Sequence, residues 1–365
     1  MKYYKLQELC IDIIDCPHST PNWKNEGIRV IRNFNLKDGN IDFIDGYFVD
    51  EATYIERTKR AVPEEGDIII SREAPMGVVG IVPKGLKCCL GQRLVLLKVN
   101  KQKCDPFYLL NTLMSDFVQT QFRRADATGS IVSNLCIPDL KEIIIPVIEH
   151  GQREVASFFE MINRKRTINN MINDNLEQQM HLIFENMMAK AATHKLSGKY
   201  TIAQNLATVV TGKEDANFSV PNGKYKFFTC SNTPLSCDEY SFDASSILIA
   251  GNGDFNVKHY SGKFNAYQRT YVLTPDKKYF GLLYLASLYR INSFKSRSSG
   301  SIVKFITKSD VENIPVFIPN DRFYLQELNK LIYLQEQNKL ENELLVNLRD
   351  WLLPMLMNGQ ATISD

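Results

Sequence analysis

Apolar residues in the segment 152–188 recur with helical spacing, and neither Gly nor Pro interrupts the segment. The repeating positions are Phe158, Ile162, Ile168, Ile172, Leu176, Met180, Ile183 and Met187. Because residues three or four apart share one face of an α-helix, this pattern predicts a single amphipathic helix. Such a helix would span roughly 55 Å, far more than is usual in a globular domain. The segment therefore divides the chain into two parts.

The part before this helix has the pattern of a mixed α and β domain. Short β-branched runs at 27–31, 66–71 and 93–99 predict strands, which turn sequences rich in Gly and Pro separate. Aromatic and aliphatic residues at helical intervals predict a helix over 106–124, with Asp105 as its N-terminal cap. An apolar run then closes the domain just before the long helix.

The part after the long helix repeats this order. Strands are predicted at 245–250 and 266–273, and a helix is predicted at 279–293. The second of these strands contains the pair Gln268-Arg269, which matches Gln92-Arg93 at the start of the strand at 93–99 in the first half. This similarity of order suggests that one unit occurs twice.

A shared tetrapeptide tests the repeat, because Gly-Ser-Ile-Val occurs at 129–132 and again at 300–303. If the match is more than chance, the same register must hold on both sides of it. Matching pairs at this register are Arg124 with Lys295, Asp139 with Asp310, Leu140 with Val311, Ile143 with Ile314, and Ile145 with Val316. The sequence therefore predicts an internal duplication of a globular domain followed by a long helix.

The second long helix is predicted at 323–358, interrupted only near its end by Pro354. The fold class is accordingly α+β, with two mixed α/β domains separated by two long helices. The predicted boundaries are a first domain at 1–148, a central helix at 149–190, a second domain at 191–320 and a C-terminal helix at 321–365.

Each long helix has a broad apolar face, and the simplest partner for each is the other. An internal pseudo-two-fold axis would make this an antiparallel, coiled-coil-like pair that holds the two domains at its opposite ends. Several polar residues lie on or beside the seam, where they either fix the register or are merely exposed. These residues are Asn169, Asn173, Gln179, Gln335 and Asn338.

Composition narrows the class of protein. Lys and Arg number 43 and Asp and Glu number 41, so no strong overall charge attracts a polyanion. Nonspecific, histone-like DNA binding is therefore disfavoured, whereas local basic patches remain open. The eight cysteines form no CxxC pair, which indicates free thiols in a reducing compartment. Without an apparent leader or a run of eighteen apolar residues, a cytoplasmic location is expected.

No catalytic set emerges from the motifs, so the chain is predicted not to be an enzyme. The pair Gly212-Lys213 lacks the earlier Gly of a P-loop, and the five histidines lack the spacing of metal ligands. Pro138-Asp139 and Pro275-Asp276 are not followed by the acidic and Lys positions of a nuclease site.

Basic, hydroxyl and amide side chains cluster in the predicted loops, and these are the groups that contact phosphates and base edges. The alternative for each residue alone is a solvated surface position, but both halves place cations and hydroxyls just before the same loop. The candidate DNA-binding residues of the first half are Arg32, Lys59, Arg60, Arg72, Arg93, Arg123, Arg124 and Ser130. Those of the second half are Lys213, Asn252, Lys258, Arg269, Lys295, Arg297, Ser298, Ser301 and Lys304.

Three features together resemble the DNA specificity subunit of type I restriction-modification systems. They are the tandem of domain and helix, the Gly-Ser-Ile-Val before each closing strand, and the Asp-Leu-x-x-Ile or Asp-Val-x-x-Ile before a Pro. The resemblance covers nearly the whole chain. The family's Gln at each helix entry matches Gln152 and Gln326, while its neighbouring Glu is displaced here. The loop 15–21 also resembles a polar loop that faces DNA in the family, which adds Ser19 and Thr20 to the candidates.

This resemblance implies a non-catalytic restriction-system subunit with two target recognition domains. Each domain would read one half of a bipartite sequence in double-stranded DNA, and the helix pair would set the gap. Modification (methyltransferase) subunits and restriction (motor-nuclease) subunits would be the partners and would bind the S-adenosylmethionine, ATP and Mg that this chain does not bind. The alternative is a protein–protein scaffold without DNA specificity.

Overall fold

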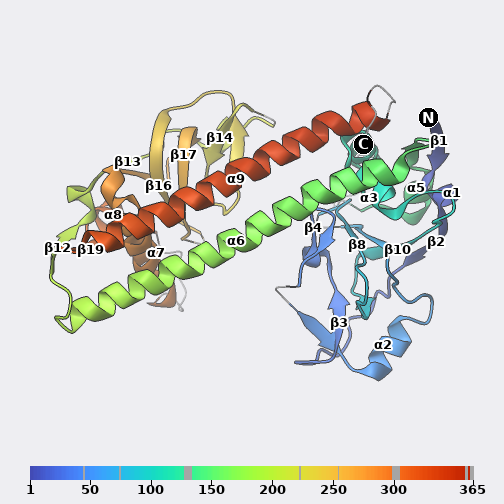
Figure 1. Cartoon of the computed structure of the whole chain (residues 1–365), viewed down its shortest axis with the longest axis horizontal. Helices are drawn as coiled ribbons and strands as arrows, with labels where there is room; N and C mark the ends of the chain where they lie inside the picture. Colours follow the sequence, from blue (N-terminus) through green and yellow to red (C-terminus); the bar gives the residue numbers. More distant parts are fainter. Residues whose placement is uncertain are drawn as a thin grey trace. The chain divides into compact units, whose positions relative to one another are not determined.

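The chain divides into two structural units. The computed structural model describes residues 1–43, 46–73, 75–126, 134–221, 223–253, 255–297, 305–357 and 361, apart from the side chains of 126, 294–297 and 357. Unit 1 comprises Met1–Ile168 and Asn342–Asp365, and unit 2 comprises Asn169–Glu341. Two long helices, α6 (Gln152–Ala192) and α9 (Arg322–Met357), contribute residues to both units (Figure 1).

Unit 1 contains an antiparallel sheet whose strand order is β2-β10-β7-β8. Its strands are β2 (Cys10–Asp15), β10 (Leu94–Val99), β7 (Ile68–Ser71) and β8 (Val79–Ile81). A second sheet has the order β6-β3-β9, with β6 (Tyr47–Val49), β3 (Ile28–Ile31) and β9 (Cys88–Leu90). Two short pairs are β1 (Lys2–Lys5) with β11 (Ile144–Val147), and β4 (Leu36–Lys37) with β5 (Asn40–Ile41). The helices are α1 (Leu6–Leu9), η1 (Asn33–Asn35), α2 (Glu51–Arg57), α3 (Pro106–Met114), α4 (Asp116–Asp126) and α5 (Ile137–Glu142).

Unit 2 has one six-stranded sheet in the order β13-β18-β16-β17-β14-β15. Its strands are β13 (Ala207–Thr211), β18 (Thr270–Pro275), β16 (Phe242–Ala250), β17 (Val257–Ala266), β14 (Tyr225–Phe228) and β15 (Leu235–Cys237). A separate pair joins β12 (Gly198–Ile202) to β19 (Pro315–Pro319). The helices are η2 (Ala203–Asn205), η3 (Ala216–Phe218), η4 (Lys277–Tyr279), α7 (Phe280–Arg297) and α8 (Lys308–Glu312).

The strand pairings confirm the internal duplication. The antiparallel series β2-β10-β7-β8 has the connectivity of β13-β18-β16-β17, and the parallel pair β3·β9 corresponds to β14·β17. β17 pairs with β16 along its first part and with β14 along its last part. It therefore corresponds to both β8 and β9 of unit 1. Because β17 is continuous, the strands that form two separate sheets in unit 1 form a single sheet in unit 2.

The predicted antiparallel helix pair is present in each unit, and α6 lies beside α9 in Figure 1. In unit 1 both helices pack on the main core, α6 through Val155 and Phe159 and α9 through Leu353 and Leu356. In unit 2, Asn169 near the middle of α6 bonds Glu341 of α9, whereas Lys190 near the end of α6 bonds Tyr324 at the start of α9. The two helices thus run in opposite directions.

The polar seam of unit 2 fixes the register of the pair. The Gln335 side chain, 3% exposed, donates from Nε2 to the Asn173 carbonyl and to Glu177 Oε2, both at 2.9 Å. Asn338 Nδ2 donates to Asn173 Oδ1 at 2.9 Å. Because a one-turn slip would take the partners of the buried Gln335 amide away, the register interpretation holds for these contacts. Gln179, in contrast, is exposed.

Replacing Gln335 by Met, which has a similar volume, is expected to lower the free energy of unfolding of unit 2 by about 1–2 kcal/mol. The Asn173 carbonyl and Glu177 lose their buried donor, while the loss of the amide oxygen offsets part of this cost. Urea denaturation followed by far-UV circular dichroism measures the change. Gln179→Met is the matched control, expected within about 0.5 kcal/mol of wild type; equal effects of both variants would contradict the register role.

A second buried polar contact in unit 2 joins β17 to α9. His259 Nδ1 lies 2.7 Å from Glu336 Oε1, and Lys339 Nζ lies 3.3 Å from His259 Nε2. Burial raises the pKa of Glu336, but the hydrogen bonds and charges of His259 and Lys339 lower it more, so the net pKa lies below the ordinary value of 4.5. The carboxylate form of Glu336 therefore stabilises the folded unit.

This depressed pKa gives unit 2 an acid-sensitive contact. Stability from Glu336 is expected to be fully present above pH 4.5, the ordinary value, and to be lost as pH falls through the lower folded pKa. Hydrogen–deuterium exchange of peptides from β17 measures local stability from pH 7 down to acid. Glu336→Gln is expected to reduce the pH dependence of that exchange relative to wild type, and identical pH profiles would refute the assignment.

Three predicted elements differ from the structure. The helix predicted at 106–124 is two helices, because Ser115 has extended backbone (ψ 150°) and its Oγ accepts from the Val118 N–H. The strand predicted at 266–273 begins only at Thr270. Pro354 does not interrupt α9, which continues to Met357, and this proline is exposed. Among the described residues, no helix combines the length and apolarity needed to span a membrane.

Candidate nucleic-acid interface

Three loops of unit 1 meet at one edge of its main sheet: the loop after β2, the loop after β7 and the loop before β10. Main-chain bonds hold them together, from Cys16 N–H to the Leu94 carbonyl (3.1 Å) and from Arg72 N–H to the Arg93 carbonyl (2.9 Å). We call the three loops, residues 16–20, 72–73 and 92–93, the reading edge of unit 1. It brings together Ser19, Thr20, Arg72 and Arg93 from the sequence-predicted set.

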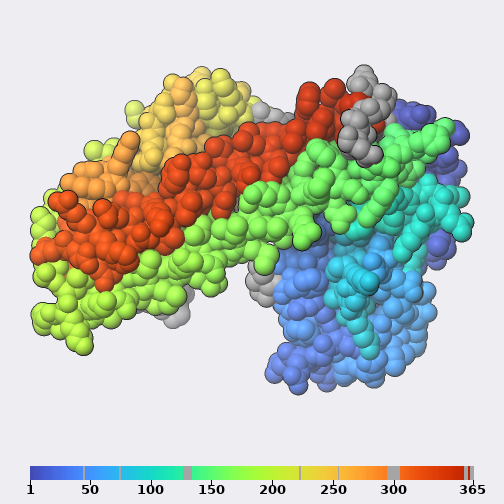
Figure 2. All heavy atoms as spheres, viewed as in Figure 1, coloured from blue at the N-terminus to red at the C-terminus, as the bar shows by residue number. Residues whose placement is uncertain are grey.

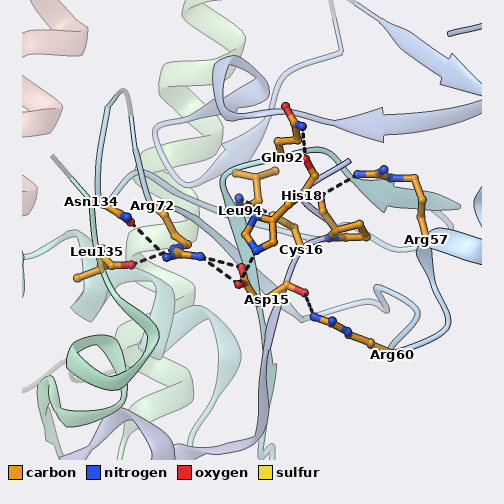
Figure 3. Close-up of polar contacts among 11 residues, drawn as sticks. Asp15, Cys16, His18, Arg57, Arg60, Arg72, Gln92, Leu94, Asn134 and Leu135 are labelled. Carbon is orange, nitrogen blue, oxygen red and sulfur yellow. Dashed lines mark hydrogen bonds and ion pairs between the residues drawn. The ribbon is translucent and has the colours of Figure 1, made fainter. Parts of the chain in front are cut away.

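Arg72 is a cross-link inside this edge (Figure 3). Its Nη1 lies 3.0 Å from each carboxylate oxygen of Asp15, its Nε donates to the Leu135 carbonyl at 3.0 Å, and its Nη2 donates to Asn134 Oδ1 at 3.3 Å. The side chain is only 13% exposed. Since three protein groups already use its donors, Arg72 holds the edge in place and has little surface to offer a ligand.

Arg57 and Gln92, absent from the predicted set, fix the loop that contains Ser19 and Thr20 (Figure 3). Buried Arg57 donates to the Leu90 carbonyl from Nε (3.0 Å) and Nη2 (2.9 Å), to the Ser19 carbonyl (2.9 Å) and to the Pro17 carbonyl (3.3 Å). Gln92 Nε2 donates to the His18 carbonyl and to Thr20 Oγ1. The one sequence signal for Arg57 is its position one helical turn after Tyr54 on the inward side of α2.

Exposed groups on this edge carry hydroxyl and guanidinium functions. Ser19, Thr20 and Arg93 are exposed, and Arg93 adopts a φ of +66°. Arg93 Nε pairs with Glu73 Oε2 at 3.1 Å, and the Arg93 side chain remains 56% exposed. Lys59 and Arg60 are also exposed. They lie near this edge, since Arg60 Nη1 donates to the Asp15 carbonyl at 3.4 Å. Because the Arg93 side chain is mostly exposed, its ion pair with Glu73 is expected to contribute little stability.

Unit 2 builds the same edge with other side chains. The Gly212 N–H donates to the Thr270 carbonyl (3.0 Å), and the Gly251 N–H donates to the Arg269 carbonyl (2.8 Å), matching the bonds made by Cys16 and Arg72. Lys213, Asn252 and Arg269 therefore occupy the three loops of this second reading edge. Lys213 and Arg269 are exposed, and Asn252 is half-buried.

Lys258 of unit 2 has a supporting role like that of Arg57. Its Nζ donates to the Thr229 carbonyl at 3.2 Å and to the Ser231 carbonyl, and Asn256 Nδ2 donates to the Cys230 carbonyl at 2.7 Å. Burial lowers the pKa of Lys258. This lysine positions the loop that follows β14, beside the backbone of Arg269.

Three other predicted residues that the structure describes, Arg32, Arg123 and Arg124, lie outside the reading edges. Arg123 pairs with Asp116 at 2.8 Å, and Arg124 borders a hollow with Tyr3 and Phe117. Arg32 stacks among aromatic rings next to the first edge. The side chains of Lys295 and Arg297, on the last turn of α7, lie outside the described atoms. Ser130, Ser298, Ser301 and Lys304 lie outside the described residues.

The side chains displayed on these edges are hydrogen-bond donors and acceptors. Within the described residues, no three His, Cys, Asp or Glu side chains are placed to share a metal ion. All eight cysteines are free, and burial raises the pKa of Cys10, Cys88 and Cys104 to about 12, so these thiols stay protonated and unreactive. What both edges offer is a set of hydrogen-bond donors and acceptors on a fixed frame.

Similarity to known proteins points to one family. The model of the type I restriction modification DNA specificity domain matches residues 1–178 and 199–347. The type I restriction enzyme EcoDI specificity subunit of Escherichia coli is 36% identical over 164 residues, which are 43% of this chain and 37% of that protein. The putative type I restriction enzyme MjaX specificity subunit of Methanocaldococcus jannaschii is 29% identical over 131 residues, 36% of this chain and 28% of that protein. The chain thus matches well under half the length of these curated relatives.

A solved structure shares the fold. The crystal structure of the type I restriction-modification system S subunit from M. genitalium aligns with 100% of this chain and 96% of its own, with a TM-score of 0.56 and 17% sequence identity. The arrangement of repeated mixed domains and long helices is thus an established fold. The family model and the curated relatives confirm the resemblance seen in the sequence. With both of its repeats matched by the family model, the chain belongs to the type I restriction modification DNA specificity family.

Proposed function

We propose that this chain is the DNA specificity subunit of a type I restriction-modification complex, in which each unit reads one half of a bipartite target. One observation carries the proposal: both units present the same three loops at the same sheet edge, fixed by equivalent main-chain bonds but furnished with different side chains. Two units with the same frame and different exposed polar groups are suited to recognising two different DNA sequences. Family membership favours this function over a scaffold without DNA specificity.

The side chains on each edge suit both kinds of contact that specific DNA binding needs. Exposed arginines and lysines, such as Arg60 and Lys213, suit phosphates and would position each unit. Hydroxyl, amide and guanidinium groups, such as those of Thr20, Asn252 and Arg269, suit base edges in the major groove. The α6–α9 pair would set the unread gap between the half-sites.

Methyltransferase subunits are the proposed protein partners, and they would dock on the long helices. Leu344, Leu348 and Trp351 lie on one face of α9 in unit 1 and are 59%, 39% and 63% exposed. The red helix is uncovered on the face shown in Figure 2. Large apolar side chains at helical spacing, open to water, are typical of a protein interface. The partners would contribute S-adenosylmethionine and the methyl transfer, and motor-nuclease subunits would contribute ATP- and Mg-dependent restriction.

Selection from a library of random duplexes tests the DNA function. The full chain, alone and with its methyltransferase subunit, is incubated with the library at moderate salt, and bound duplexes are sequenced. Enrichment of a motif with two specified halves and an unspecified gap is expected. If folded protein with its partner enriches no motif, the proposal fails.

A further inference from the structure

Arg32, at the end of β3 in unit 1, is surrounded by three aromatic rings. Its guanidinium carbon lies 4.6 Å from the ring centroid of Tyr47, 5.2 Å from that of Phe34 and 5.7 Å from that of Trp23. The rings also contact one another, with Trp23 and Tyr47 edge to face at 4.7 Å. We call these four side chains the arginine–aromatic cluster. Contacts between a cation and ring faces restrict where the guanidinium can point.

The cluster lies at the surface with the polar edge of its guanidinium unused. Trp23, Phe34 and Tyr47 are 38%, 44% and 36% exposed. Among the described residues, no carboxylate pairs with Arg32 and no acceptor takes a hydrogen bond from its guanidinium. Arg57 and Arg72 differ, since each gives its donors to three protein groups. A guanidinium has five N–H donors in a planar fork, so stacking on its faces leaves the fork free for a ligand.

The cluster borders the reading edge of unit 1. The Gly91 N–H donates to the Ile31 carbonyl at 2.7 Å, and a Cβ atom on Gly91 would lie 3.0 Å from Arg32 Cγ. Gln92, the next residue, holds the loop of His18 and Thr20. Arg32 therefore stands where a duplex on the reading edge would meet it.

Unit 2 has the same frame without the cluster. Strand register matches Val30↔Tyr47 with Phe227↔Leu235, which places Leu235 at the position of Tyr47. The residues after β14 then place Thr229 at the position of Arg32 and Ser231 at that of Phe34. Since unit 2 folds the same way with a small residue at each of these two positions, the repeated frame does not need the cluster. The cluster is therefore expected to contact a ligand that unit 1 binds and unit 2 does not.

We propose that Arg32, oriented by its aromatic neighbours, donates two hydrogen bonds to a guanine in the half-site that unit 1 reads. This inference rests on the proposed function. A planar fork held in one direction matches the O6 and N7 acceptors of guanine in the major groove, which is the commonest specific contact of arginine. The exposed side chains of Lys59 and Arg60 are better suited to phosphates.

The library selection is repeated with Arg32→Lys, which keeps the charge and loses the fork. We expect preference for guanine at one position of one half-site to fall roughly 10- to 100-fold. The other half-site and binding to unrelated duplex stay within about two-fold of wild type. Phe34→Leu, which keeps Arg32 but removes one ring, is expected to weaken the same preference by a smaller factor. Thr229→Ala, at the matched position of unit 2, leaves that guanine unaffected.

The outcomes separate this inference from the proposed function. A bipartite motif in wild type, with the same guanine preference in Arg32→Lys, overturns the inference and leaves the function standing. An equal loss for all duplexes in Arg32→Lys assigns Arg32 to a phosphate and also overturns it. If wild type enriches no motif, the proposed function fails and this inference fails with it. Circular dichroism of each variant shows that the fold is retained.

Discussion

Arg57→Met is expected to lower the free energy of unfolding of unit 1 by about 2–4 kcal/mol and to abolish recognition of its half-site. Arg57 is 7% exposed, and its guanidinium connects α2 to the carbonyls of Pro17, Ser19 and Leu90. A methionine fills much of the volume but leaves three carbonyls without that donor. The loop that carries Ser19 and Thr20 would then leave the position that DNA contact requires.

Fluorescence isolates this effect, because both tryptophans of the chain, Trp23 and Trp351, belong to unit 1. Urea denaturation followed by tryptophan emission reports the stability of unit 1, and binding to the selected bipartite duplex reports function. Arg60→Met is the matched control, since Arg60 is exposed and makes a single bond of 3.4 Å. It should change stability by less than about 0.5 kcal/mol. Wild-type stability and half-site preference in Arg57→Met would show that the loop needs no such support.

Leu344→Asp combined with Trp351→Asp is expected to prevent assembly with the methyltransferase subunit while unit 1 stays folded. Both side chains are more than half exposed on one face of α9, so a carboxylate there costs the isolated chain little. In an interface, the same change loses roughly 1.5–3 kcal/mol of apolar burial per residue and adds the cost of desolvating a charge. The affinity for the partner should fall by at least about 100-fold.

Assembly is measured by sedimentation of the purified chain with its methyltransferase subunit. Ile55→Asp is the matched control, because Ile55 is a 57% exposed apolar residue of the same unit on α2, away from the long helices. Normal assembly by the α9 variant would place the partner on another surface. Loss of assembly by the control as well would indicate a general loss of solubility instead.

Periodicity and repetition were enough to predict the architecture. Residues 152–188 could be assigned to one helix because thirty-odd residues of regular spacing without Gly or Pro have no competing interpretation. The duplication followed from register, and the strand order bears it out. The misplaced boundaries were local: Ser115 ends one helix and caps the next, a role that its neighbours' helical spacing conceals.

Predicting individual site residues was harder, because residue type does not reveal direction. Arg72 and Arg93 both stand beside strands in polar loops, yet Arg72 is turned inward onto Asp15 while Arg93 remains mostly exposed. The difference depends on Asn134 and Leu135, more than sixty residues away in the chain. No local pattern contains that information. Arg57 escaped notice for the same reason, since its partners come from two other segments.

The equivalent edges of the two units rest on main-chain bonds, such as those of Cys16 and Gly212, and most of the side chains displayed there have no part in those bonds. The backbone frame and the exposed side chains are thus structurally independent in this protein. Exposed side chains such as those of Ser19 and Lys213 can be exchanged without disturbing the frame that presents them. Diversification of targets would then proceed by substituting a few exposed side chains on either edge, independently of the other, while supports such as Arg57 stay fixed.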